Sequence, residues 1–141
     1  MRLSPAAELA VRGVLELAAR HGNGPITLDT ICARRSLPKQ YLTKIFSMLV
    51  RVGIITPVRG KGGGYVLGRD PAAITLLDII EAVEGPIFLN FCQQSPSQCD
   101  QDCCTIRPIW TELQKTVRDK LGSMKVSDCI KNLPLESLPR Q

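Results

Sequence analysis

Apolar residues recur at helical spacing through the first third of the chain. Ser4 is a favourable N-cap residue and Pro5 suits a first helical position, so a helix is predicted from there to the glycines at 22 and 24. Two shorter apolar stripes follow, over residues 27–36 and 38–52, with a tight turn between them. The second has the i, i+3, i+4, i+7 pattern of a half-buried helix, formed by Leu42, Ile45, Phe46 and Leu49. Two short helices joined by a turn predict a helix-turn-helix.

A β-hairpin is predicted directly after the third helix. Residues 54–58 and 65–67 are rich in β-branched and aromatic residues and are typical of two strands. The tip between them, residues 59–64, has the sequence Arg-Gly-Lys-Gly-Gly-Gly, and glycine allows the tight reversal. A basic hairpin after a helix-turn-helix indicates the wing of a winged helix. The alternative is a flexible basic loop.

Two further helices are predicted in the second half of the chain. Thr75 and Asp78 have capping-box spacing at the start of a short apolar helix that stops at Gly85. Thr105 is expected to cap a long helix that reaches residue 129. Its apolar residues lie three or four positions apart and form a continuous stripe: Ile106, Ile109, Trp110, Leu113, Val117, Leu121 and Met124. A long amphipathic helix outside a compact domain needs a partner surface, and a second copy of the chain is the simplest one.

The pattern as a whole predicts a mainly α fold with a small β-hairpin wing. The expected parts are a winged helix-turn-helix domain over 1–85, a cysteine-rich loop over 86–104, a dimerisation helix over 105–129 and a disordered tail over 130–141. No apolar run is long enough to predict a membrane span. Glu8 and Arg12 interrupt the apolar run that a signal peptide needs, which favours a cytoplasmic protein.

Charge is divided unevenly along the chain, whose formal net charge is +5. Residues 1–69 contain eleven Lys or Arg and three Asp or Glu, whereas residues 70–141 contain seven and ten. This bias predicts a polyanionic partner, double-stranded DNA, for the first half, with a solubilising basic face as the alternative. At the start of the predicted recognition helix, the side chains expected to contact base edges are Gln40, Tyr41 and Thr43. The cations expected to contact phosphates or the minor groove are Lys39, Lys44, Arg59 and Lys61.

Four of the six cysteines lie in one loop with the spacing Cys-x6-Cys-x3-Cys-Cys: Cys92, Cys99, Cys103 and Cys104. The residues between them are polar loop formers, so the loop buries little apolar surface. A reducing cytoplasm disfavours disulfides, and the Cys-x2-Cys knuckle of many structural zinc sites is absent. Soft thiolates in a loop also suit an iron–sulfur cluster. From spacing alone, the cluster, a zinc site and free thiols stay open.

The remaining cysteines and motifs predict no catalytic site. Cys32 lies on the apolar stripe of the second helix and is expected to be a small buried hydrophobe, and Cys129 is expected to be a free thiol after the long helix. The sequence has no Walker loop, no dinucleotide-binding fingerprint and no plausible hydrolytic triad, and His21 is its only histidine. We therefore expect a protein that is not an enzyme.

Five segments together resemble the Rrf-two (Rrf2) family of bacterial winged-helix transcription regulators, of the IscR, NsrR and RirA type. They are the opening MRLS, QYLTKIFSMLVRVGII in the helix-turn-helix, RGKGGGYVLGRDP in the wing, ITLLDIIEAVEG, and the cysteine loop ending in CTIRPIW. The resemblance covers residues 1 to about 129. It implies a homodimeric repressor in which two long helices cross. It also implies that a 4Fe–4S or 2Fe–2S cluster sensing nitric oxide, redox state or iron controls operator binding.

The resemblance also implies a ligand set. Many members hold the cluster on three loop cysteines whose outer pair is twelve residues apart, as Cys92 and Cys104 are here, with Cys99 as the middle ligand. The spacing from Cys92 to Cys99 is one residue longer than the commoner one, and Cys103 is a reserve candidate.

For the fourth ligand, cluster-biogenesis members use a histidine three residues after the last cysteine, where this chain has Arg107. Members that sense nitric oxide or redox state use an acidic residue in the first helix of the other subunit, and Glu8 stands at that position. The alternative is that Glu8 is an ordinary exposed helix residue. Members without loop cysteines sense a sulfur-metabolism enzyme, and the four thiols argue against that group. The alternative to a cluster is a thiol-redox or zinc-stabilised winged-helix regulator.

Overall fold

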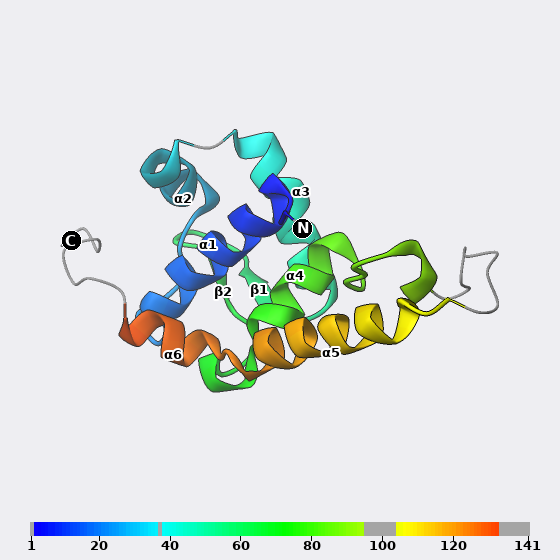
Figure 1. Ribbon diagram of the computed structural model, residues 1–141. Coiled ribbons are helices and arrows are strands. Elements are labelled where there is room, and N and C mark those ends of the chain that lie inside the picture. The colour runs from blue at the N-terminus through cyan, green and yellow to red at the C-terminus, as the bar shows by residue number, and fades with distance from the viewer. Residues whose placement is uncertain (1, 37, 95–103, 133–141) are drawn as a thin grey trace.

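A computed structural model describes residues 2–36, 38–94 and 104–132 of the chain. These residues form a compact helical body, a two-stranded antiparallel hairpin and a helix that extends to one side (Figure 1). In chain order the elements are α1 (Pro5–Ala19), α2 (Leu28–Arg35), α3 (Lys39–Arg51), β1 (Ile55–Val58), β2 (Gly64–Leu67), η1 (Pro71–Ala73), α4 (Leu76–Glu84), η2 (Phe91–Gln93), α5 (Arg107–Ser123) and α6 (Val126–Lys131). The mainly α fold with a small hairpin is confirmed.

Helices α1 and α2 begin where their capping residues predict. The Ser4 hydroxyl accepts a hydrogen bond from the backbone N–H of Ala7, and that of Thr27 accepts one from Thr30, both at 3.1 Å. After α2 the chain turns through Ser36, whose φ of 53° lies in the left-handed region. This sharp reversal lets α3 begin three residues later and pack against α2.

Phe46 lies at the centre of the hydrophobic core and is completely buried. Its ring meets Tyr65 of the hairpin edge to face, with centroids 5.0 Å apart. On the other side α1 passes so close that a Cβ atom at Gly13 would lie 2.7 Å from the Phe46 ring. One side chain of α3 therefore fixes the recognition helix against both α1 and the wing.

The hairpin pairs Ile55 with Leu67 and Val58 with Gly64. Ile26, in the loop before α2, forms an additional antiparallel bridge to Tyr65, with N–O distances of 2.9 and 3.0 Å. A Cβ atom at Gly64 would lie 2.4 Å from the Ile26 carbonyl oxygen, so glycine is required for this approach. The bridge fastens β2, the second strand of the wing, to the loop before the helix-turn-helix.

The second half of the chain contains one confirmed cap and one helix that differs from expectation. The reciprocal capping box between Thr75 and Asp78 is present at the start of α4. Thr105, by contrast, is not a cap, because α5 begins at Arg107 with Ile106 in the N-cap position and no side-chain cap hydrogen bond.

The prediction of one continuous helix to residue 129 is wrong. Helix α5 ends at Ser123, Met124 is extended, and a separate helix, α6, begins at Val126. There the chain pairs with the segment before α4: Leu76 N–H donates to the Met124 carbonyl at 3.0 Å, and Val126 N–H to that of Ile74 at 2.9 Å. Val126 is completely buried in the core. Tertiary pairing and burial thus end α5 and start α6.

The two cysteines outside the loop lie in helices. Cys32 is half-buried against the core rather than fully buried, and Cys129 lies within α6 rather than after a long helix. Of the expected tail, residues 130 and 131 belong to α6, and residues 133–141 lie outside the described part. Within the described ranges, no helix has the length and apolar character needed to cross a membrane.

Candidate DNA interface and cysteine site

The recognition helix α3 has one buried and one exposed face. Its apolar residues, including Leu42, Ile45 and Phe46, pack into the core. All five residues that the sequence assigned to DNA on this helix are exposed: Lys39, Gln40, Tyr41, Thr43 and Lys44. The Thr43 hydroxyl donates to the Lys39 carbonyl at 2.8 Å, which leaves its oxygen able to accept.

The N-terminus of α3 is suited to an anion. Pro38 is its N-cap, no side chain caps the first turn, and no acidic residue lies within that turn. The partial positive charge of the helix N-terminus is therefore open to a phosphate group.

Lys39, the first residue of α3, already has a partner. Its ammonium nitrogen lies 2.6 Å from a carboxylate oxygen of Asp29 in the first turn of α2. This hydrogen bond and the charge attraction raise the pKa of Lys39 above its ordinary value. The pair was not predicted from the sequence, because the rest of α2 and the following turn separate the two residues in the chain.

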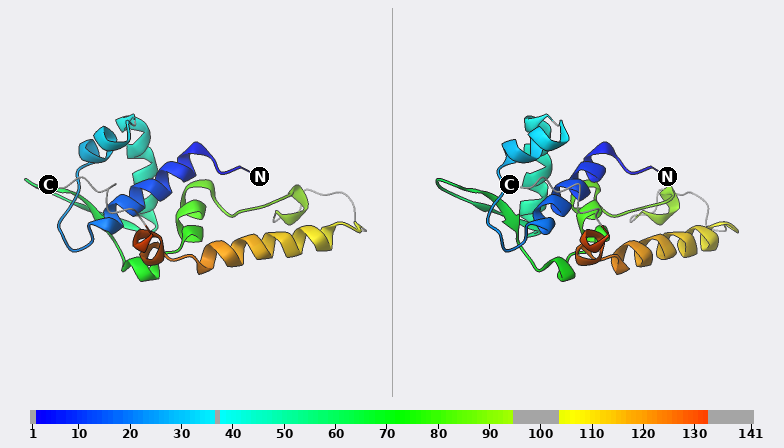
Figure 2. Two further views of the ribbon diagram at one scale, coloured as in Figure 1. Left: turned by 60° about the vertical axis from the view of Figure 1, so that its left-hand side comes forward. Right: turned by 90° about the vertical axis from the view of Figure 1, so that its left-hand side faces the viewer.

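The hairpin extends from the body as a narrow projection, which is seen clearly in the right-hand view of Figure 2. Arg59 and Lys61 are both exposed at its tip. Gly60 and Gly62 have φ values of 102° and 79°, so the tip turns through conformations that disfavour larger residues. The tip therefore carries two cations on a backbone that can approach a duplex closely.

The described thiols of the cysteine loop lie at its two ends. Cys92 is in η2, Cys104 lies three residues before the start of α5, and both are half-buried and free of disulfides. Cys99 and Cys103 lie outside the described residues, so the predicted four-thiol site is not tested. Among the residues that are placed, no group of three His, Cys, Asp or Glu could hold a metal ion.

Glu8, the predicted ligand from the partner subunit, lies in the first turn of α1. Its side chain is 56% exposed and forms an ion pair with Arg12 one turn further along. The carboxylate is thus accessible, and surface pairs of this kind contribute little stability.

The first part of the cysteine-rich loop, residues 86–94, is fastened along α5; we call it the connecting segment. The backbone N–H of Leu89 donates to the Gln114 side chain at 3.3 Å. The Gln93 amide donates to the Thr111 hydroxyl at 3.1 Å and lies 3.8 Å from the Cys92 sulfur. The position of Cys92 is therefore tied to one face of α5.

The Glu81 carboxylate joins three parts of the molecule. It is on α4, accepts the backbone N–H of Ile87 in the connecting segment at 3.0 Å, and forms an ion pair with Arg118 of α5. Both side chains of the pair are about one-quarter to one-third exposed. α4 in turn packs against α1 and α3. A continuous set of contacts thus leads from the cysteine loop to the recognition helix.

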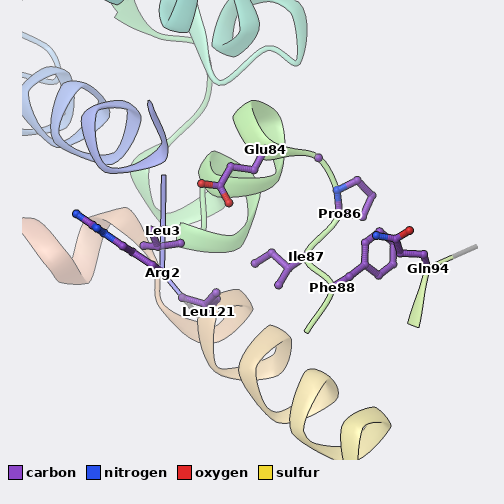
Figure 3. Close-up of a pocket in the computed structure, with 9 residues that line it drawn as sticks. Arg2, Leu3, Glu84, Pro86, Ile87, Phe88, Gln94 and Leu121 are labelled. Carbon is purple, nitrogen blue, oxygen red and sulfur yellow. The ribbon is translucent and has the colours of Figure 1, made fainter. Parts of the chain in front are cut away.

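A cavity of about 240 Å³ lies where the N-terminal segment, the end of α4, the connecting segment and α5 meet (Figure 3). The backbone N–H of Ser4 donates to Glu84 at 2.7 Å beside it. Leu3 and Phe88 line the cavity, and both remain exposed.

Helix α5 also has an exposed apolar face. Of the 17 residues of α5, none is buried, and both views in Figure 2 show the helix projecting from the body beside the connecting segment. Ile109 and Leu113 are 53% and 45% exposed and lie one turn apart on the same face. Ile106 and Met124, which flank α5, are also exposed. Such an apolar face indicates an interaction surface.

Three comparisons place this architecture among known proteins. Residues 3–132 match the Rrf2 family, described as iron-dependent transcriptional regulators. The HTH-type transcriptional regulator IscR of Xenorhabdus nematophila is 33% identical over 132 residues, which cover 94% of this chain and 80% of that protein.

Two solved structures of named regulators have the same fold as this chain. The global cysteine regulator CymR of B. subtilis superposes with a TM-score of 0.83 at 32% identity, covering 95% of this chain and 99% of the other. IscR of T. potens superposes with a TM-score of 0.80 at 26% identity, covering 100% and 94%.

A winged helix with an exposed recognition helix and a basic wing defines a DNA-binding transcription regulator, not an enzyme. The chain belongs to the Rrf2 family of these regulators.

Proposed function

We propose that the chain is a homodimeric repressor, acting in the cytoplasm, whose operator affinity is controlled by an iron–sulfur cluster. The observation that carries this proposal is the attachment of Cys92 to α5 through Gln93 and Thr111. It connects the first thiol of the loop to the helix that we assign to dimerisation. A change in the loop can then alter the geometry of the dimer.

The donor set fits a cluster. Thiolates are the usual ligands of iron–sulfur clusters, and the described thiols at the two ends of the loop are half-buried and not consumed by disulfides. We propose Cys92, Cys99 and Cys104 as ligands, with Cys103 in reserve. The cluster, 4Fe–4S or 2Fe–2S, would supply reactivity toward nitric oxide, oxidants or loss of iron.

We propose Glu8 of the partner subunit as the fourth ligand. Its carboxylate is exposed, and its only described ion pair is a surface pair with Arg12, so little is lost when it turns to a metal. Arg107 cannot take this role, because a guanidinium has no lone pair to donate.

The dimer would form through α5. Its exposed apolar face would be covered by the same face of a second copy, as a two-fold symmetric interface requires. In that arrangement each recognition helix enters a major groove, and the half-sites of the operator lie about one helical turn apart or a multiple of it.

The proposed linkage runs through the connecting segment. An ordered cluster would fix the loop, the Gln93–Thr111 contact would pass its position to α5, and Glu81 would pass it to α4 and the DNA-binding body. Loss of the cluster would then change the spacing of the two recognition helices and shift the equilibrium between operator-binding and non-binding dimers.

Anaerobic purification of the full chain tests the proposal. We expect a brown protein with near-stoichiometric iron and sulfide, and a Mössbauer spectrum that defines the nuclearity. Protein that contains zinc, or no metal at all and only reversible disulfides, would contradict the cluster. Either result would support the thiol-redox or zinc-stabilised regulator instead.

A further inference from the structure

Asp29 is an isolated acidic residue within the DNA-binding half of the chain. Between Glu16 and Asp70 the sequence contains nine Lys or Arg residues and only this one carboxylate. This stretch includes the whole helix-turn-helix and the wing. A negative charge there opposes binding to phosphate, so its position needs a physical explanation.

The structure places that carboxylate on the first cation of the recognition helix. Asp29 lies 2.6 Å from the Lys39 ammonium, and the two side chains are 72% and 60% exposed. Exposed pairs of this kind contribute little to folding, because water and salt screen them. Asp29 also lies in the first turn of α2, where its charge favours the helix dipole, but that effect does not require the contact with Lys39.

The surroundings of Lys39 make its charge important for DNA binding. It begins α3, whose N-terminus is uncapped by side chains and free of acidic residues in its first turn. Gln40 and Lys44 are exposed on the same helix. An unpaired ammonium at this point would be well placed to reach a phosphate, but the Lys39 ammonium is paired with Asp29.

We propose that Asp29 attenuates DNA binding by holding Lys39 away from the phosphate backbone. Each cation that contacts a phosphate releases counterions and steepens the dependence of log K on log salt by about 0.9. Holding Lys39 removes one such contact from every complex, whatever the DNA sequence. The regulator then binds weakly enough for a signal to release it.

The test uses Asp29→Asn, which removes the charge and keeps the shape. Binding of the full chain to a fluorescein-labelled random-sequence duplex is measured by anisotropy over a salt series. We expect the salt slope to steepen by about one unit, and affinity at about 0.1 M salt to rise roughly five- to tenfold. Circular dichroism and sedimentation check that the variant keeps its fold and its mass.

Asp119→Asn is the matched control. Asp119 forms an equally exposed ion pair with a lysine, Lys115, and raises the pKa of that lysine in the same way, but it lies on α5. The Asp119→Asn substitution changes the net charge by the same amount as Asp29→Asn, but at a position that is not near the recognition helix. Its salt slope should equal that of the wild type, and an equal rise in both variants would overturn the proposal.

Lys39→Met separates this mechanism from simple charge repulsion. In the wild-type background Lys39→Met should leave the salt slope nearly unchanged, because on this proposal Asp29 holds Lys39 away from the phosphates. In the Asp29→Asn background Lys39→Met should return the salt slope to its wild-type value. An equal loss in both backgrounds, or weaker binding by Asp29→Asn itself, would show that Asp29 does not sequester Lys39.

Discussion

The α5 surface permits a quantitative prediction about assembly. Ile109 and Leu113 are about half exposed, and complete burial of such side chains stabilises by about 1.5–3 kcal/mol each. Covering the exposed half should therefore contribute about 1 kcal/mol per side chain. A symmetric dimer contains each residue twice, so the four side chains together contribute about 4 kcal/mol.

The double variant Ile109→Ala/Leu113→Ala removes most of this term while each residue keeps its Cβ atom. We expect a loss of about 3 kcal/mol, which weakens the dimer about a hundredfold. Folding of the subunit should change little, because neither side chain is buried within it. Sedimentation equilibrium over a concentration series measures the dimer dissociation constant directly.

The control is Lys115→Ala/Asp119→Ala. At 100° per residue Lys115 lies about 120° and 160° around the helix from Ile109 and Leu113, and Asp119 lies about 80° and 120° from them. Both positions are therefore outside the apolar face, and they pair with each other. This variant should dimerise like the wild type. A wild-type chain that is monomeric at micromolar concentration, or an apolar double variant with an unchanged dissociation constant, would refute the assignment of α5.

Four further predictions concern the cluster, the linkage and DNA. Alanine at Cys92, Cys99 or Cys104 should abolish cluster binding, whereas alanine at Cys32, Cys103 or Cys129 should retain it; full iron in Cys104→Ala with none in Cys103→Ala would reverse the assignment. Glu8→Ala should leave a dimer whose cluster has an altered spectrum or decays faster under nitric oxide, and identical spectra and decay would remove Glu8 from the site. Glu81→Gln should keep the cluster but reduce the difference in operator affinity between cluster-loaded and cluster-free protein; an undiminished difference would exclude this route. Arg59→Ala and Lys61→Ala should each flatten the salt dependence by roughly one unit on all sequences, whereas Gln40→Ala should cost about 1–3 kcal/mol on the operator and little on random DNA. Wing variants that match the wild type at every salt concentration would show that the hairpin does not contact DNA.

Local signals in the sequence predicted most of the secondary structure. Ser4, Thr27 and the Thr75–Asp78 box each mark a helix start that the structure confirms, because capping depends on residues within one turn. The apolar stripe of α3 likewise predicted its buried face.

Features that depend on distant residues were not predictable from local pattern. The apolar stripe of α5 continues in register into residue 124, yet pairing with residues 74–76 and burial of Val126 end the helix at Ser123. The Ile26 bridge to Tyr65 and the Asp29–Lys39 pair likewise join residues separated in the chain. Spacing and composition contain no signal for such contacts.

The sequence predicts a cysteine site as a set of residues, and this stays a prediction because Cys99 and Cys103 lie outside the described residues. Clustered thiols in a polar loop indicate metal or redox chemistry from sequence alone. That Cys92 is tied to α5 through Gln93, and that Glu81 joins α4, the connecting segment and α5, follows only from the folded chain.

The most direct test of the central claim is the operator dissociation constant of one anaerobic preparation, measured before and after the cluster is removed. Coupling between two sites typically amounts to about 1–3 kcal/mol, so we predict a change of roughly five- to 150-fold at constant salt, with the dimer intact in both states. Equal dissociation constants for the loaded and cluster-free dimers would contradict control of DNA binding by the cluster.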